Sequence, residues 1–160
     1  MHSRIFQITT EQVERENYLN ENTLEQGDAS PIDYCSEIDD DEREQNIACL
    51  VGAILPKGMF TRVGTNIIRY NGGMEQWKAE TVAMIQEKAA ALTADNLFRY
   101  SAHRNLEQAL VNPLDTAYLF YTDTEGLQGY ADQSYYFMLF VGGLEEGTLL
   151  HIGGVIDYHF

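Results

Sequence analysis

The sequence predicts a single α+β domain, in which a mixed or antiparallel sheet packs against about three helices. Two kinds of periodicity support this fold class. Apolar residues alternate with polar ones in the final stretch, 148–160, which is the period of a strand. They recur every three or four residues in 40–55 and 73–92, which is the period of a helix. The chain of 160 residues has the length of about one domain.

Three parts of differing composition make up this predicted domain, 1–160. The first, 9–39, is acidic, polar and rich in loops, the second, 40–111, is helical, and the third, 116–160, is aromatic and rich in strands. β-Branched and aromatic residues bounded by glycine, proline or polar clusters predict further short strands, at 3–8, 59–63, 66–70 and 117–122.

The acidic run SEIDDDEREQ, residues 36–45, has three possible meanings: a cation site, a mimic of nucleic-acid phosphates, or the start of a helix. Asp39 precedes Glu42 by three residues, which is the spacing of a helix capping box. Acids in the first turn of a helix stabilise it by roughly 0.3–1 kcal/mol each. We therefore favour the helix start, with a weak cation site in 37–42 as the alternative.

The residues after this run predict a helix with one apolar face, which consists of Ile47, Leu50, Val51 and Ile54. The opposite face is small or apolar (Ala48, Cys49, Ala53), which predicts a helix buried on more than one side.

Two further helices are predicted in the middle of the chain. The stripe of Trp77, Met84 and Ile85 marks the helix 73–92, and Thr93 is the predicted cap of the helix 94–111. The apolar run 134–141 is compatible with a helix or a strand, and its aromatic content favours a strand. In the last strand, Gly153-Gly154 predicts a bulge that would exchange the two faces partway along.

The formal net charge of −15 is concentrated near the N-terminus, since residues 1–50 carry 13 acids against three arginines. Such a surface repels nucleic acids and anionic membranes, so we expect direct binding to neither, and it attracts basic proteins. The alternative is that the charge only keeps the protein soluble. The candidate partner-binding residues are Glu11, Glu14, Glu16, Glu21 and Glu25.

Asp157 and His159 are the candidate catalytic residues. They are two apart on a predicted strand, so their side chains share one face about 7 Å apart, where they could orient each other or reach one metal. His151 lies about 20 Å away along an extended strand and is not expected to join them. The alternative is that both are ordinary polar residues of an edge strand. No metal site and no cofactor are predicted.

Other functional signatures are missing from the sequence. It contains no glycine-rich phosphate-binding motif, no nucleophile elbow and no calcium-binding loop. Cys35 and Cys49 have no zinc-site spacing. Acids near Cys35 should raise its pKa, and Cys49 is expected in the core. The chain shows no secretory signal and no apolar run of membrane-spanning length, so a cytoplasmic protein is expected.

Three functions are compatible with these observations. The preferred one is a non-enzymatic binding or inhibitor-type module for a basic protein partner. The first alternative is a small hydrolase or metal-dependent enzyme that uses Asp157 and His159. The second is a structural or assembly subunit that self-associates through its aromatic C-terminal third.

Overall fold

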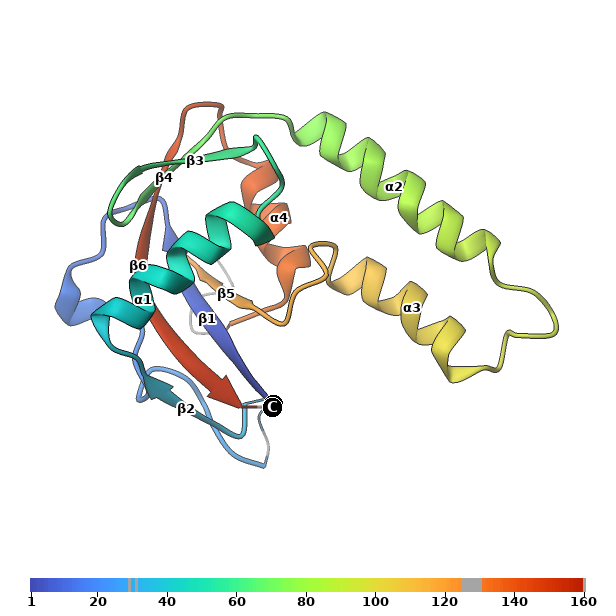
Figure 1. Cartoon of the computed structure of the whole chain (residues 1–160), viewed down its shortest axis with the longest axis horizontal. Helices are drawn as coiled ribbons and strands as arrows, with labels where there is room; N and C mark the ends of the chain where they lie inside the picture. The colour runs from blue at the N-terminus through green and yellow to red at the C-terminus, as the bar shows by residue number, and fades with distance from the viewer. Residues whose placement is uncertain (29, 31, 125–130, 160) are drawn as a thin grey trace.

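The sheet is built around its longest strand, β6 (Leu149–His159) (Figure 1). The structure is a computed structural model, and it describes residues 1–28, 30, 32–124 and 131–159. The other strands are β1 (His2–Thr9), β2 (Tyr34–Glu37), β3 (Phe60–Gly64), β4 (Ile67–Tyr70) and β5 (Leu119–Thr122). The helices are α1 (Asp40–Cys49), α2 (Met74–Ala90), α3 (Tyr100–Val111) and α4 (Ser134–Gly142), with a 3₁₀ turn η1 (Arg15–Asn17) and a π-helical turn η2 (Leu50–Ile54).

The described strands form one mixed sheet in the order β3-β4-β6-β1-β5, with β2 also paired to β6. β1 runs parallel to β5, and the other neighbouring strands are antiparallel. One edge of β6 is occupied by β1. The other edge is shared, because β4 pairs with residues 149–151 and β2 pairs with residues 156–159. The predicted α+β domain with a mixed sheet is therefore confirmed.

Different parts of the chain cover the two faces of the sheet. α1, η2 and α4 bury Ile47, Leu50 and Phe137, respectively, against one face, which contains Phe6 and Val155. The opposite face is covered by the loop-rich segment between β1 and β2, which buries Leu19, Leu24 and Ile32. The acidic segment is thus anchored to the domain by its few apolar side chains, as hydrophobic burial requires.

The predicted bulge lies in the middle of β6. Phe6 pairs with Val155 and Ile8 pairs with Ile152, so two residues of β6 face one residue of β1. The extra residue exchanges the faces of the strand. Leu150 and Ile152 belong to the cluster under α1 and α4, together with Val155, whereas Ile156 and Tyr158 belong to the opposite cluster.

Gln7, the residue opposite the bulge, connects the sheet to the acidic segment. Its buried Oε1 accepts hydrogen bonds from the backbone N–H of Gly154 and of Leu19, both at 2.8 Å. The two glycines are required by this packing. A Cβ at Gly153 would lie less than 3.0 Å from Gln7 Oε1, and one at Gly154 less than 3.0 Å from the Leu19 carbonyl oxygen.

Arg43 of α1 fills the gap between β2 and β4 along the edge of β6. Its guanidinium donates to the carbonyl oxygens of Ile152, at 2.9 Å, and of Gly153, and to Asn66 Oδ1 at 2.7 Å. It also lies over the ring of Tyr18, 5.3 Å from the centroid. A side chain thus replaces the strand neighbour that these carbonyl groups would otherwise need.

The start of α1 confirms the interpretation of the acidic run. Asp39 is the N-cap, and its carboxylate accepts a hydrogen bond from the Glu42 N–H at 2.7 Å. The expectation of burial on more than one side is wrong, since Ala48, Cys49 and Ala53 are exposed. Small side chains tolerate either environment, so their pattern did not determine the buried face.

Two helix predictions need correction. Residues 134–141 belong to helix α4 and not to a strand, and the buried face of this helix consists of Phe137, Met138 and Val141. The ring of Phe137 stacks on that of Phe120, with the ring centroids 4.3 Å apart. α3 begins at Tyr100, and its N-cap is Arg99 and not Thr93. The side chain of Asn96 forms hydrogen bonds with the Thr93 N–H and the Ala91 carbonyl, which favours a turn there over a helix.

α2 and α3 form a hairpin that extends away from the sheet, which we call the arm, residues 74–111 (Figure 1). The arm contributes little to the core, because Met74 is the buried residue of α2 and Ala109 is that of α3. The predicted stripe of Trp77, Met84 and Ile85 is half-buried.

The glycines of the bulge provide a test of the fold. We expect Gly154→Ala to destabilise the protein by about 1–3 kcal/mol, because the new methyl group overlaps the backbone of Leu19. Gly52→Ala is the matched control, since a Cβ there meets nothing within 4 Å, and it should be neutral or stabilising by roughly 0.5–1 kcal/mol. Urea unfolding measures both, and equal stabilities would contradict this packing.

Candidate functional site

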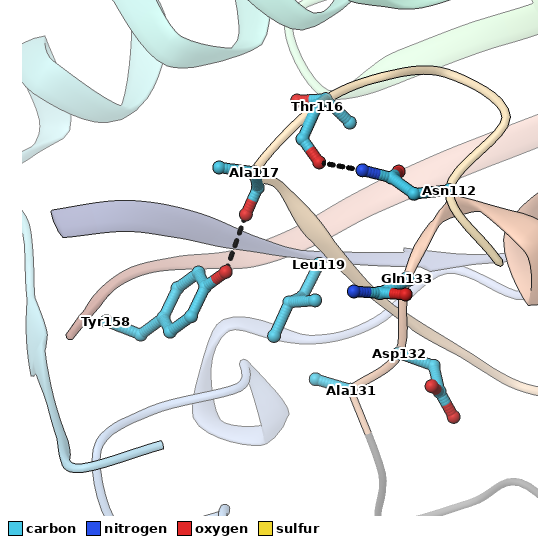
Figure 2. Close-up of a pocket in the computed structure, with 8 residues that line it drawn as sticks. All are labelled: Asn112, Thr116, Ala117, Leu119, Ala131, Asp132, Gln133 and Tyr158. Carbon is cyan, nitrogen blue, oxygen red and sulfur yellow. Dashed lines mark hydrogen bonds between the residues drawn. The ribbon is translucent and has the colours of Figure 1, made fainter. Parts of the chain in front are cut away.

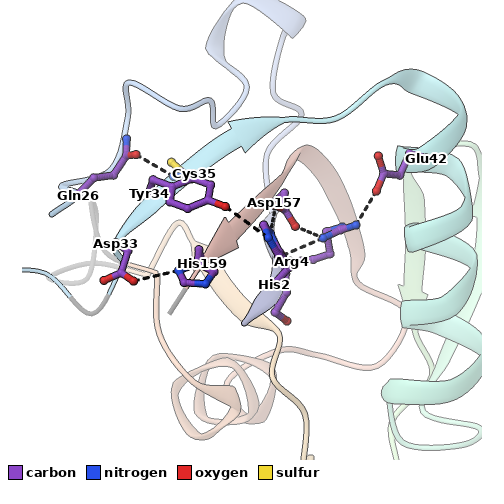
Figure 3. Close-up of polar contacts among 10 residues, drawn as sticks. His2, Arg4, Gln26, Asp33, Tyr34, Cys35, Glu42, Asp157 and His159 are labelled. Carbon is purple, nitrogen blue, oxygen red and sulfur yellow. Dashed lines mark hydrogen bonds and ion pairs between the residues drawn. The ribbon is translucent and has the colours of Figure 1, made fainter.

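Asp157 and His159 lie after the bulge on β6 and are bound to different partners (Figure 3). Asp157 forms an ion pair with Arg4 of β1, and its other oxygen lies 2.7 Å from His2 Nδ1. His159 Nδ1 lies 2.9 Å from the carboxylate of Asp33. The structure thus brings both residues into one polar cluster, in which each interacts with neighbours from other strands.

Aromatic contacts complete this cluster, which we call the terminal cluster (His2, Arg4, Asp33, Tyr34, Asp157, His159). Tyr34 OH lies 3.3 Å from His2 Nε2, so a carboxylate, an imidazole and a phenol are connected in a line. The His159 ring stacks on the Tyr34 ring, with the ring centroids 5.2 Å apart. The His2 ring contacts the His159 ring edge-on, with the centroids 5.3 Å apart. The Asp157 contact fixes the orientation of the His2 ring.

The terminal cluster connects four elements of the fold. Arg4 bridges Asp157 of β6 and Glu42 of α1, while His2 and Tyr34 come from β1 and β2. Sequence analysis did not identify His2, Arg4 or Tyr34, because their partners lie up to 155 residues away in the chain. His151 lies before the bulge, opposite Thr9 and Ile67, and is not part of the cluster.

The chemistry available to the terminal cluster is proton transfer along the line from Asp157 through His2 to Tyr34. His2 and Tyr34 are both exposed, so this line ends at the open surface. Within the described part of the chain, no group of three or more histidine, cysteine, aspartate or glutamate residues is arranged to hold a metal ion. A catalytic role for Asp157 and His159 stays a prediction.

A separate hollow of about 330 Å³ lies between β5, β6 and the start of α4 (Figure 2). Tyr158 OH donates a hydrogen bond to the Ala117 carbonyl at 2.6 Å, and Asn112 Nδ2 donates to the Thr116 carbonyl at 2.6 Å. Burial raises the pKa of Tyr158 to about 12, so its phenol stays protonated at neutral pH. The hollow contains polar groups, but two of its donors are already used by the backbone.

The five candidate partner-binding glutamates are all exposed: Glu11, Glu14, Glu16, Glu21 and Glu25. Among the described residues none of them forms an ion pair, whereas acids of α1 do. Glu42 forms an ion pair with Arg4. Glu44 forms one with Arg62, in which Nη2 lies 2.6 Å from Oε2. The hydrogen bond from this guanidinium lowers the pKa of Glu44. The segment that precedes α1 therefore carries five exposed glutamates whose charge no ion pair among the described residues offsets.

The two cysteines have opposite environments. Cys35 is buried, and its pKa is raised first by burial and then by the nearby charge of Glu21. The predicted direction is therefore confirmed, with burial as the larger cause. The expectation for Cys49 is wrong, because it lies on the exposed face of α1. Tyr118 OH donates to Cys49 Sγ at 3.6 Å.

No protein-family model, curated protein or solved structure matches this chain. The described helices include none with the length and apolar character required to cross a membrane.

The two aspartates of the terminal cluster should differ in how much they contribute to the stability of the protein. Asp157→Asn should cost about 1–3 kcal/mol of stability, because it removes the charge from a largely buried contact with Arg4. Asp33→Asn makes the same change next to His159 at a side chain that is 60% exposed, and should cost less than about 0.5 kcal/mol. Thermal and urea unfolding compare the two variants, and equal costs would refute the assigned role of Asp157.

Proposed function

We propose that this protein is a non-enzymatic binding or inhibitor-type module that engages a basic protein partner through its acidic N-terminal segment. The observation that carries this proposal is the arrangement of that segment. Its leucine and isoleucine side chains are buried under the sheet, whereas its five candidate glutamates are exposed and lack ion pairs among the described residues.

The segment holds these charges on an ordered support. Leu19 is fixed by the hydrogen bond from its N–H to Gln7, and Arg15 contacts Asp40 of α1 at 3.0 Å. A pre-ordered charged surface loses less conformational entropy on binding than a flexible acidic tail. It also accelerates encounter with a cationic partner and rejects other acidic surfaces, and both effects weaken as salt is added.

The proposal includes a cytoplasmic location, where a basic intracellular partner would be available. It does not require the terminal cluster, whose residues interact with one another and with α1.

A charge-matched pair of variants tests the proposed surface. The fivefold Glu→Gln change at Glu11, Glu14, Glu16, Glu21 and Glu25 should reduce recovery of a basic partner in a low-salt pull-down by about tenfold or more. The control removes five acids outside both the acidic segment and the arm (Asp41, Asp115, Asp132, Glu145, Glu146), which changes the net charge equally. It should change recovery by less than about twofold. Equal losses, or a partner retained at high salt, would contradict the proposal.

A variant of Asp39 distinguishes an effect on stability from an effect on partner binding. Asp39→Ala removes the N-cap of α1 and should lower the free energy of unfolding by about 1 kcal/mol. Its effect on partner recovery should be small, because the five glutamates are unchanged. If Asp39→Ala reduced the free energy of partner binding by more than the free energy of unfolding, the contact surface would lie on α1 instead.

A further inference from the structure

The arm carries an exposed apolar tip. Leu97, Phe98 and Tyr100 lie at or beside the turn between α2 and α3, and the side chain of Phe98 is 96% exposed. Single exposed apolar residues are ordinary, but a group of them at the end of a projecting hairpin is typical of a contact surface.

An apolar hollow of about 420 Å³ lies at the base of the same arm, between α2 and α4. Its apolar lining is Met74, Trp77, Pro113, Tyr135, Met138 and Leu139. A second hollow shares Tyr135 with it, and its other lining residues are Leu110, Val111, Tyr136, Asp132 and Gln133. The apolar hollow at the base of the arm is therefore large enough to receive an aromatic side chain.

The tip and the base are separated by the length of α2. Its 17 residues span about 25 Å. When two arms lie antiparallel about a twofold axis, each tip lies over the base of the other arm. A surface with a projection and a matching depression on the same element can therefore pair with its own copy in a closed, isologous contact.

The charges of the arm are complementary in this antiparallel arrangement. The tip half, 84–104, has three cations against two acids, whereas the base half, 74–83 with 105–111, has three acids against Lys78. A slightly basic tip would thus face an acidic base. The acidic segment packs on the face of the sheet opposite α4, so its glutamates stay apart in such a pair.

The exposed apolar area is sufficient for a stable pair. Nine apolar side chains of the arm and α4 are between 39% and 96% exposed: Val82, Leu97, Phe98, Tyr100, Leu110, Val111, Tyr135, Tyr136 and Leu139. Since an aromatic side chain alone contributes about 150–250 Å² when buried, they represent on the order of 1,000 Å². A standard interface buries about 800 Å² per partner.

We propose that a second copy of this chain docks on the arm, with Phe98 of each copy seated in the hollow of the other beside Leu139. The interface is separate from the acidic segment, so the dimer presents two acidic surfaces to partners.

Oligomeric state is the first test. Sedimentation equilibrium should give twice the mass of one chain for the wild type, and Phe98→Ala should raise the dissociation constant of the dimer by about tenfold or more. Val63→Ala is the control, because Val63 is an apolar side chain of β3 that is 47% exposed and lies outside the arm. Unchanged circular dichroism and urea unfolding of the monomer would show that Phe98→Ala still folds.

Disulfide cross-linking tests the antiparallel arrangement. In a Cys49→Ser background, Phe98→Cys and Leu139→Cys chains should form a cross-linked dimer when mixed, and neither should cross-link alone. Cross-linking of Phe98→Cys with itself would overturn the tip-to-base arrangement. A wild-type chain that stays monomeric at about 1 mM would overturn the self-association and leave the hollow to a helix of another protein.

Discussion

The buried side chain of Gln7 connects the parts of this fold that would otherwise be independent. Its Oε1 accepts the N–H groups of Gly154 in the central strand and of Leu19 in the acidic segment. Both acceptor bonds depend on a bulge that brings two glycines opposite one glutamine. On the adjacent edge, Arg43 satisfies the carbonyl groups that the bulge leaves between β2 and β4. Buried polar groups are costly when unpaired, so the bulge, the acidic segment and α1 stabilise one another.

Much of this arrangement was predictable from local pattern, and the rest was not. The N-cap Asp39 and the Gly153-Gly154 bulge each have a signal within a few residues. Helix α4 was missed because an apolar run of eight residues fits either period, and packing against β5 determines the outcome. The terminal cluster joins His2 to Asp157 across nearly the whole chain, and strand order cannot be obtained from one sequence. Asp157 and His159 were correctly placed on one strand, but their partners were not identified.

The charge and the exposed apolar area are on different parts of the molecule. The acidic segment is fixed to the sheet through buried leucines, whereas the arm extends from the opposite side and adds little to the core. A charged surface mainly determines association rate and partner choice, and an apolar surface mainly supplies affinity. The fold therefore permits two contacts that do not compete: an acidic one for a basic partner and an apolar one for a second copy.

Native-state hydrogen exchange would test most directly whether Gln7 unites the body of the protein. The N–H groups of Gly154 and Leu19 share one acceptor, so both should exchange only through global unfolding, with the same free energy and the same denaturant dependence. Amides in the middle of α2 should exchange at a lower free energy, because the arm has little buried surface. Exchange of Leu19 through a local opening that leaves Gly154 protected would show that the acidic segment is not coupled to the sheet, and would contradict this account.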